Sequence, residues 1–138
     1  MIIKIQDSKK TVSTPLDIHK ILKDYFAVVD EVDLDKEHFF CFLLDARNRV
    51  KVADLVSIGI LNASLAHPRE IYTRAVKYRC SQVVVAHNHP SGNPGPSDSD
   101  IEITKKLVEA GKIIGIELID HIIYTADKLY SFREHRLI

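Results

Sequence analysis

Three observations predict a three-layer α/β fold for this chain, with helices on both faces of a mixed sheet. Short apolar runs rich in β-branched and aromatic residues alternate irregularly with segments of helical period. The runs 39–44 and 50–59 are separated by the turn-forming residues 45–48, which predicts an antiparallel hairpin. The chain has 138 residues, 46% of them hydrophobic, which suits a single domain over residues 1–138 with a proper core.

The first third of the chain is expected to supply an arm, a helix and the start of the sheet. Residues 1–14 are too few for a domain and predict an edge strand or an arm. Thr14-Pro15 is typical of a helix start, because a hydroxyl cap is followed by proline at the first helical position. The acidic segment 30–35 predicts a loop. The apolar face predicted for the helix comprises Ile18, Ile21, Leu22, Tyr25 and Phe26.

A second helix and a buried strand come next. After a connector at residues 61–66, proline at position 68 favours the first turn of a helix, which we predict over residues 68–77. The β-branched run at residues 82–87 predicts the buried strand. The helix side chains expected to point inward are Ile71, Ala75, Val76 and Tyr78.

The last third of the chain predicts a long helix and two strands. The helix begins at Ser97 and ends near Gly111 or Gly115, because glycine is common just past a helix C-terminus. Strands are expected at residues 116–124 and 129–132. The apolar residues of the helix follow a helical period and are Ile103, Leu107, Ala110 and Ile114.

Composition bounds the functional classes. The 19 basic and 19 acidic residues cancel, so the chain lacks the basic excess typical of proteins that bind nucleic-acid phosphates, and composition gives nucleic-acid binding no support. Cys41 and Cys80 have no framework spacing and predict small buried residues of a reducing compartment, not a disulfide. The N-terminus has no signal-peptide core and no run approaches a membrane span, so we expect a cytoplasmic protein.

A candidate metal site follows the buried strand. His87 and His89 stand two residues apart at its C-terminal end, so both imidazoles project from the same face. The Gly/Pro-rich loop leads into an acidic helix start, which places Asp100 in the first helical turn, beside the histidines. Two imidazoles and one carboxylate are a common ligand set of catalytic zinc sites, in which the fourth position stays open for water.

Two alternatives remain at the helix start. Asp98 is the rival third ligand, although it projects from a different side of the turn. The spacing of Ser97 and Asp100 also matches a variant of the capping box, in which serine and the acidic residue satisfy each other's backbone N–H groups. Both roles of Asp100 can hold, since the geometry that caps the helix also aims the carboxylate at the metal. Gly92 and Gly95 allow the sharp path of the loop between strand and helix.

At these positions the chain resembles a known family. The JAMM (MPN+) metalloprotease motif consists of two histidines followed at fixed spacing by a serine and an aspartate. This chain reproduces it with His87, His89, Ser97 and Asp100. The wider text of residues 87–92, together with Asp120-His121, is similar to the bacterial RadC family. The similarity runs from about Glu37 to the C-terminus. It implies a JAMM/MPN architecture of the cytidine-deaminase-like type and a Zn2+ ion on the two histidines and Asp100.

The resemblance also implies the remaining parts of the site. The general base of the family is a glutamate at the start of an early strand, where Glu37 fits and Glu70 is the competitor. Ser97 is implied as a hydroxyl that holds the water or stabilises the oxyanion. We expect structural or substrate-side roles, not metal ligation, for His38, His67 and His121, and surface positions for His19 and His135. The polar residues that could contact substrate include Asn62, Ser64, His67, Asn88 and Asn93.

The function implied is hydrolysis of a peptide or isopeptide bond in a peptide or protein substrate. Longer RadC relatives carry a helix-hairpin-helix segment ahead of this domain, and residues 1–36 are too few to hold it, so we expect this chain to lack it. Two alternatives stay open: a DNA-repair-associated factor, after the family's historical label, and a catalytically silent metal-binding module that docks a partner.

Overall fold

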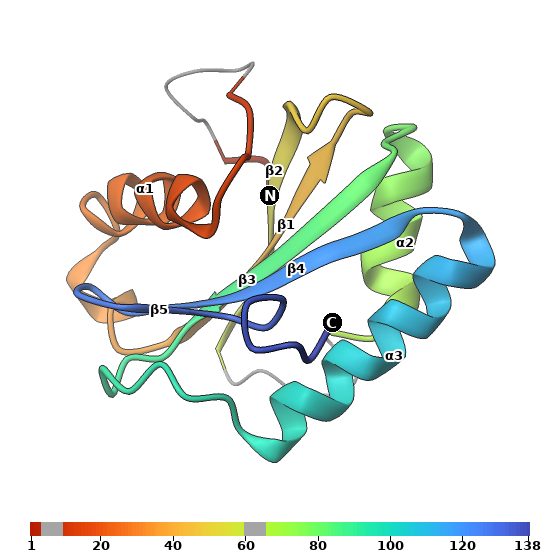
Figure 1. The fold of residues 1–138 in the computed structure, drawn as a ribbon. Coiled ribbons are helices and arrows are strands. Elements are labelled where there is room, and N and C mark those ends of the chain that lie inside the picture. Colours follow the sequence, from red (N-terminus) through yellow and green to blue (C-terminus); the bar gives the residue numbers. More distant parts are fainter. Residues whose placement is uncertain (4–9, 60–65) are drawn as a thin grey trace.

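The computed structural model describes residues 1–3, 10–59 and 66–138. It has three layers, in which a five-stranded sheet lies between two layers of helices (Figure 1). Helix α1 covers one face of the sheet, and α2 and α3 cover the other. The predicted three-layer α/β fold is therefore confirmed. The helices are α1 (Pro15–Phe26), α2 (Pro68–Lys77) and α3 (Asp98–Ile114), with a short 3-10 turn, η1 (Glu31–Asp33), in the predicted acidic loop.

The sheet is mixed, as the hairpin and the alternation of elements predicted. Strand β1 pairs antiparallel with both β2 and β3, whereas β3 and β4 are parallel and are joined by the crossover through α3. Strand β5 returns antiparallel to β4, which gives the order β2-β1-β3-β4-β5. The strands are β1 (Glu37–Leu44), β2 (Val50–Gly59), β3 (Gln82–Asn88), β4 (Glu117–Tyr124) and β5 (Leu129–Ser131).

Alternation along the central strands divides the core between the two faces. In β1, Phe39 and Cys41 pack with α2 and α3, while Phe40 and Phe42 pack with α1. Strand β3 is buried on both sides, as expected for a central strand of a layered α/β fold. The face that carries Phe39 also carries His87, because these two residues are directly opposite in the β1–β3 ladder. The candidate metal site therefore lies on the α3 side of the sheet.

Two residues that were predicted to point inward from the helices are exposed, so these two predictions are wrong. Val76 of α2 is 58% exposed and Ile114 of α3 is 46% exposed. Tyr72 is buried instead, and its hydroxyl donates to the carbonyl of Leu107 on α3 across 2.8 Å. Gly111 makes this contact possible, because a Cβ there would lie 2.5 Å from the Tyr72 hydroxyl oxygen. Val76 is five residues after the buried Ile71 and so lies off the buried stripe of α2, while Ile114 is the last residue of α3.

Several smaller expectations concern the chain ends and cysteines. Among the described residues of the N-terminal segment, Ile2 forms an isolated bridge with Asp54 of β2, and Thr11 forms one with Arg49 just before that strand. Helix α3 ends at the second of the two predicted glycines, since Gly115 is left-handed at φ 82°. Cys41 and Cys80 are buried free thiols, and burial raises the pKa of Cys41 to about 12.

Most of the connector at residues 61–66, with the substrate-contact candidates Asn62 and Ser64, lies outside the described residues. Within the described ranges, no helix has the length and apolarity needed to cross a bilayer.

Candidate metal centre

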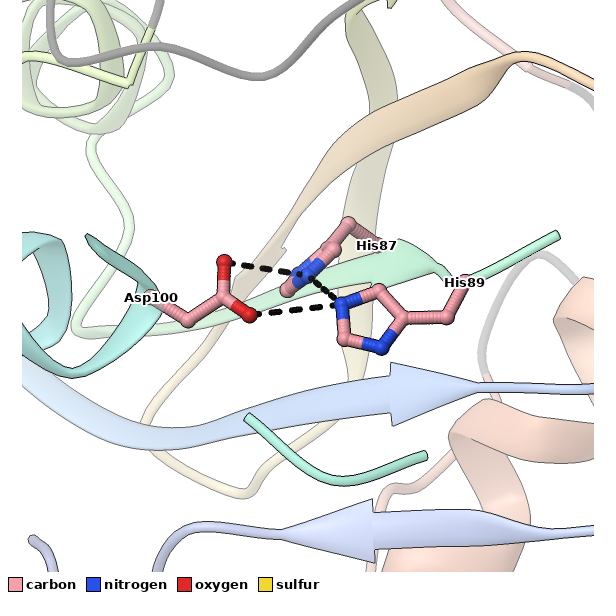
Figure 2. Close-up of side chains that lie close together, drawn as sticks. All are labelled: His87, His89 and Asp100. Atoms are coloured by element: carbon pink, nitrogen blue, oxygen red, sulfur yellow. Dashed lines mark hydrogen bonds and ion pairs between the residues drawn. The ribbon is translucent and has the colours of Figure 1, made fainter. Parts of the chain in front are cut away.

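Three side chains converge at the junction of β3 and α3 (Figure 2). His87 is the penultimate residue of β3, His89 follows the strand directly, and Asp100 lies in the first turn of α3. One ligand atom from each of the three lies within 4.8 Å of the others. The group is shielded, since His87 and Asp100 are buried and His89 is half-buried. This arrangement is the one that the spacing predicted, and it is able to hold a metal ion.

The interatomic distances show how closely the donor atoms approach. The two Nε2 atoms of His87 and His89 are 3.0 Å apart. The Asp100 oxygens lie 3.4 Å from Nε2 of His87 and 3.3 Å from Nε2 of His89. Nδ1 of His89 donates to the carbonyl of Asn93 across 2.9 Å, so the neutral His89 ring directs its Nε2 lone pair into the group. Such a set of nitrogen and oxygen donors fits a divalent cation such as zinc.

The loop between strand and helix is shaped by its own backbone bonds. The N–H of His89 donates to the carbonyl of Tyr124 on β4, which continues the sheet one residue past β3. The N–H of Gly92 then closes a turn onto the His89 carbonyl, with Gly92 left-handed at φ 85°. The Asn93 side chain accepts from the N–H of Gly95 and tightens the next turn. These bonds bring the start of α3 back beside the end of β3.

Ser97 and Asp100 form the capping box that the sequence allowed. The Ser97 hydroxyl accepts from the Asp100 N–H across 3.0 Å, and an Asp100 oxygen accepts from the Ser97 N–H across 2.9 Å. The cap fixes the carboxylate with its remaining lone pairs toward the histidines, so the capping and metal-facing positions coincide. Asp98 is exposed and does not belong to the three-residue group.

The electrostatics of the group favour an ionised carboxylate beside the imidazoles. Burial alone would raise the pKa of Asp100, but the close contacts of its carboxylate with the His87 and His89 rings outweigh burial and hold that pKa well below its usual range. The close contact with the Asp100 carboxylate is the main cause that raises the pKa of His89, and the charge of Glu37 acts in the same direction. A cation placed among these groups is therefore compensated by the negative charge of Asp100.

Glu37 faces the same space. It is the first residue of β1, two residues before Phe39, which pairs with His87, so its side chain shares their face of the sheet. It lines a pocket of about 360 Å³ at the metal group. Glu70 lies instead on α2, with a carboxylate oxygen 3.5 Å from Arg74. The residues that line the pocket are Glu37, His89, Pro90, Ser91, Ser97, Ser99 and Asp100.

Comparison with known proteins agrees with this geometry. A family model described as a RadC-like JAB domain matches residues 12–137. The chain belongs to the RadC family. A UPF0758 protein of Alkaliphilus oremlandii is 50% identical over 105 residues, which are 76% of this chain and 45% of that protein. A UPF0758 protein of Caldanaerobacter subterraneus is 37% identical over 134 residues, 97% of this chain and 55% of that protein. The chain spans about half the length of the curated relatives it matches.

The other histidines of this RadC-family domain lie outside the three-residue group. His38 is buried between the Tyr25 hydroxyl and the carbonyl of Asp33. His67 caps α2, where its Nδ1 accepts from the N–H of Arg69. These contacts give both residues structural roles.

The expectation for His19 is wrong, and that for His135 is confirmed. His19 is half-buried, its ring lies 4.8 Å from that of Tyr124, and its Nε2 bonds the carbonyl of Thr125. The reason is that α1 crosses the end of β4. His135 is exposed, with its ring stacked on Tyr130 at 3.9 Å.

Two polar residues beside the centre have roles that the sequence did not reveal. Asn88 is buried and joins β3 to β1, since its oxygen accepts from the N–H of His38 and its amide donates to the carbonyl of Lys36. Thr104 is buried one turn after Asp100 and bonds His121. The spacing of four residues from Asp100 is the one sequence signal that could have indicated Thr104, because residues four apart share a helix face.

Proposed function

We propose that this domain is a zinc-dependent hydrolase of the JAMM type that cleaves a peptide or isopeptide bond. The observation that carries the proposal is the convergence of His87, His89 and Asp100, with Glu37 lining the same pocket. Membership of the RadC family supports it, because the family model is described as a RadC-like JAB domain. The three converging residues would hold the zinc. When bound, the ion would lower the pKa of a coordinated water and polarise the scissile carbonyl.

Glu37 is the proposed general base. It stands at the start of β1, beside the strand end that carries the two histidines. In this role its carboxylate takes a proton from the attacking water and returns it to the departing amine. Such acid–base assistance typically contributes about 10² to 10⁴ in rate. Glu70 is the weaker candidate, because its carboxylate is paired with Arg74, whose Nε donates to Asp54 across 2.7 Å.

Ser97 is the proposed donor to the oxyanion. Its hydroxyl oxygen already accepts from the N–H of Asp100, which leaves the hydroxyl proton available to another acceptor. The side chain is exposed and lines the pocket, so a carbonyl oxygen that enters the pocket can reach it. A donor positioned before the reaction begins stabilises the charge that develops on that oxygen.

Space for a peptide exists next to the centre. A second pocket, of about 570 Å³, shares His89 and Pro90 with the smaller one and continues toward α1. Its walls include Phe26 and Tyr124, with Lys23 and Lys128 among the lining residues. The two pockets are adjacent at His89 and Pro90, so a peptide held at the metal centre could extend past these residues to the apolar wall that includes Phe26 and Tyr124. This adjacency supports a peptide or protein substrate.

A pair of matched variants tests the proposal. Zinc-loaded wild type, Glu37→Gln and Glu70→Gln proteins are incubated with a mixture of defined peptides and isopeptides, and products are identified by mass spectrometry. We expect cleavage by wild type and Glu70→Gln, and a loss of at least about 10²-fold in Glu37→Gln with zinc content unchanged. Full activity in Glu37→Gln would show that Glu37 is not the base. A zinc-loaded wild type that cleaves nothing would support the silent-module alternative.

A further inference from the structure

A buried chain of hydrogen bonds starts at the ligand His87 and ends on the helix of the third ligand. Nδ1 of His87 lies 2.8 Å from Nε2 of His121 on β4. Nδ1 of His121 lies 2.7 Å from the hydroxyl of Thr104 on α3. That hydroxyl donates to the carbonyl of Asp100 across 2.7 Å. His87 and Asp100 are therefore connected by a second path that does not pass through the metal position.

The hydrogen bond from Thr104 to the Asp100 carbonyl sets the donor–acceptor direction of the other hydrogen bonds in the series. A carbonyl only accepts, so the single hydroxyl proton of Thr104 is committed to Asp100. The Thr104 oxygen must then accept from His121, which places the proton of His121 on Nδ1. A neutral imidazole has one donor and one acceptor nitrogen, so Nε2 of His121 accepts from Nδ1–H of His87. Nε2 of His87 is left as a lone pair that faces His89 and Asp100.

This direction requires a neutral His121, and its surroundings provide the reason. The His121 ring is fully buried, with 0% exposure. Phe132 stacks on it at 4.6 Å, and Phe39 meets it edge-on at 6.3 Å. Its two hydrogen-bond partners are an imidazole and a hydroxyl, and neither carries a negative charge. A charged ring in this apolar position without an anionic partner would be costly, so the neutral form is favoured.

We propose that His121 and Thr104 are positioning residues that hold His87 as the tautomer protonated on Nδ1 and so preset its Nε2 lone pair for the metal. The inference rests on the proposed function, because it concerns the affinity of the same centre. Hydrogen-bond partners of ligating histidines commonly fix the ring and its tautomer, and their loss typically costs about 10- to 100-fold in metal affinity. The same chain also ties β4 to α3 and keeps the ligand-bearing strand and helix in register before any ion binds.

Thr104→Val is the decisive variant, because it changes no ligand and keeps a β-branched side chain in the helix. Without the hydroxyl, Nδ1–H of His121 loses its acceptor, and the tautomer of His121 protonated on Nε2 becomes the better one. That tautomer would meet Nδ1–H of His87 with a second donor, so the His87 ring must change tautomer or turn. We expect zinc affinity to fall about 10- to 100-fold, whereas Thr104→Ser keeps the hydroxyl and the wild-type affinity.

Substitutions of His121 provide the second arm. His121→Phe retains a ring against Phe132 but removes the acceptor, and we expect the same loss of zinc affinity. His121→Gln supplies an amide oxygen near the position of Nε2 and should recover part of it. Thr73→Val, at an exposed position of α2, is the matched control that leaves affinity unchanged.

The experiment measures zinc affinity by competition with a chelator, and the positions of the imidazole protons by nitrogen NMR on the zinc-free and the zinc-loaded wild type. The expected results are the losses above and a His121 proton on Nδ1. A His121 proton on Nε2 overturns the proposal without any variant, and so does wild-type affinity in folded Thr104→Val. If wild type binds zinc and the variants bind it with the same affinity, only the proposed role of His121 and Thr104 is wrong. If wild type takes up no zinc, the proposed function is wrong as well.

Discussion

Asp100 serves the fold and the candidate centre from one position. One of its oxygens closes the capping box with the Ser97 N–H, while both oxygens lie within 3.4 Å of a histidine nitrogen. The two roles were readable from the spacing, because a capping box fixes the direction of the side chain three residues into the helix. The bond between Thr104 and His121 was not readable, since it joins a helix and a strand whose packing no local pattern specifies.

The two roles of the capping pair separate experimentally. Ser97→Ala removes the cap and should lower the free energy of unfolding by about 1 kcal/mol, with zinc affinity little changed. Asp100→Asn keeps an oxygen for the Ser97 N–H but loses the negative charge, so zinc affinity should fall sharply while the cap persists. Urea unfolding of the metal-free proteins and zinc titration measure the two quantities. A strong loss of affinity in Ser97→Ala would show that the serine contributes to metal binding itself.

At the scale of elements, the contact of α2 with α3 shapes the layer above the centre. Tyr72 lies over Gly111 and donates to Leu107, a contact between the two helices that the periodicity of neither helix specifies. The strands were predicted more accurately than the helix faces. The run 50–59 and the helix 68–77 match the observed bounds, because β-branched runs and a proline at the first turn are strong local signals.

Gly111→Ala tests the closeness of the helices. The new Cβ would lie 2.5 Å from the Ile116 carbonyl oxygen and from the Tyr72 hydroxyl. The backbone carbonyl cannot move aside cheaply, so we expect a loss of about 1 to 3 kcal/mol in the free energy of unfolding. Urea denaturation checks this, with Lys112→Ala, at the exposed neighbouring position, as the control. Unchanged stability in Gly111→Ala would mean that the helices lie farther apart.

The Tyr72 hydroxyl also predicts a dependence on pH. Burial raises its pKa from 10.0 to about 12 in the folded chain. As pH rises, the unfolded chain releases this proton at a lower pH than the folded chain does. The contribution of the protonated Tyr72 to the free energy of unfolding is therefore complete below about pH 10 and is lost as pH rises toward 12. Tyr72→Phe should be less stable than wild type by about 1 kcal/mol at pH 8, through the lost hydrogen bond. The difference should shrink and reverse near pH 12 in urea denaturation, and parallel curves would contradict the assignment.

At the scale of the whole molecule, the proposed ion would connect the end of β3 to the start of α3. The order of the strands could not be predicted from the sequence, because pairing between distant segments depends on packing rather than on local pattern. The position of the centre was nevertheless predicted, since both histidines follow one strand and Asp100 follows one loop. These three residues depend on a single strand–loop–helix unit, whereas Glu37 reaches them only through the pairing of β1 with β3.

Removal of zinc should therefore destabilise the entire domain. An ion that binds only the folded chain adds about 4 kcal/mol at a free concentration one thousand times its dissociation constant. We expect chelator to lower the melting temperature of wild type in calorimetry. His89→Ala should melt at the same temperature with and without zinc, because it lacks a ligand. Equal melting of wild type in both conditions would contradict a structural contribution of the ion.

We propose that one zinc ion binds among His87, His89 and Asp100. The most direct test is a crystal structure of the zinc-loaded protein with diffraction measured on both sides of the zinc absorption edge. We expect a single anomalous peak, about 2.0 to 2.2 Å from Nε2 of both histidines and from an Asp100 oxygen. A peak bound by other residues, or a folded protein with no peak in the presence of zinc, would contradict it.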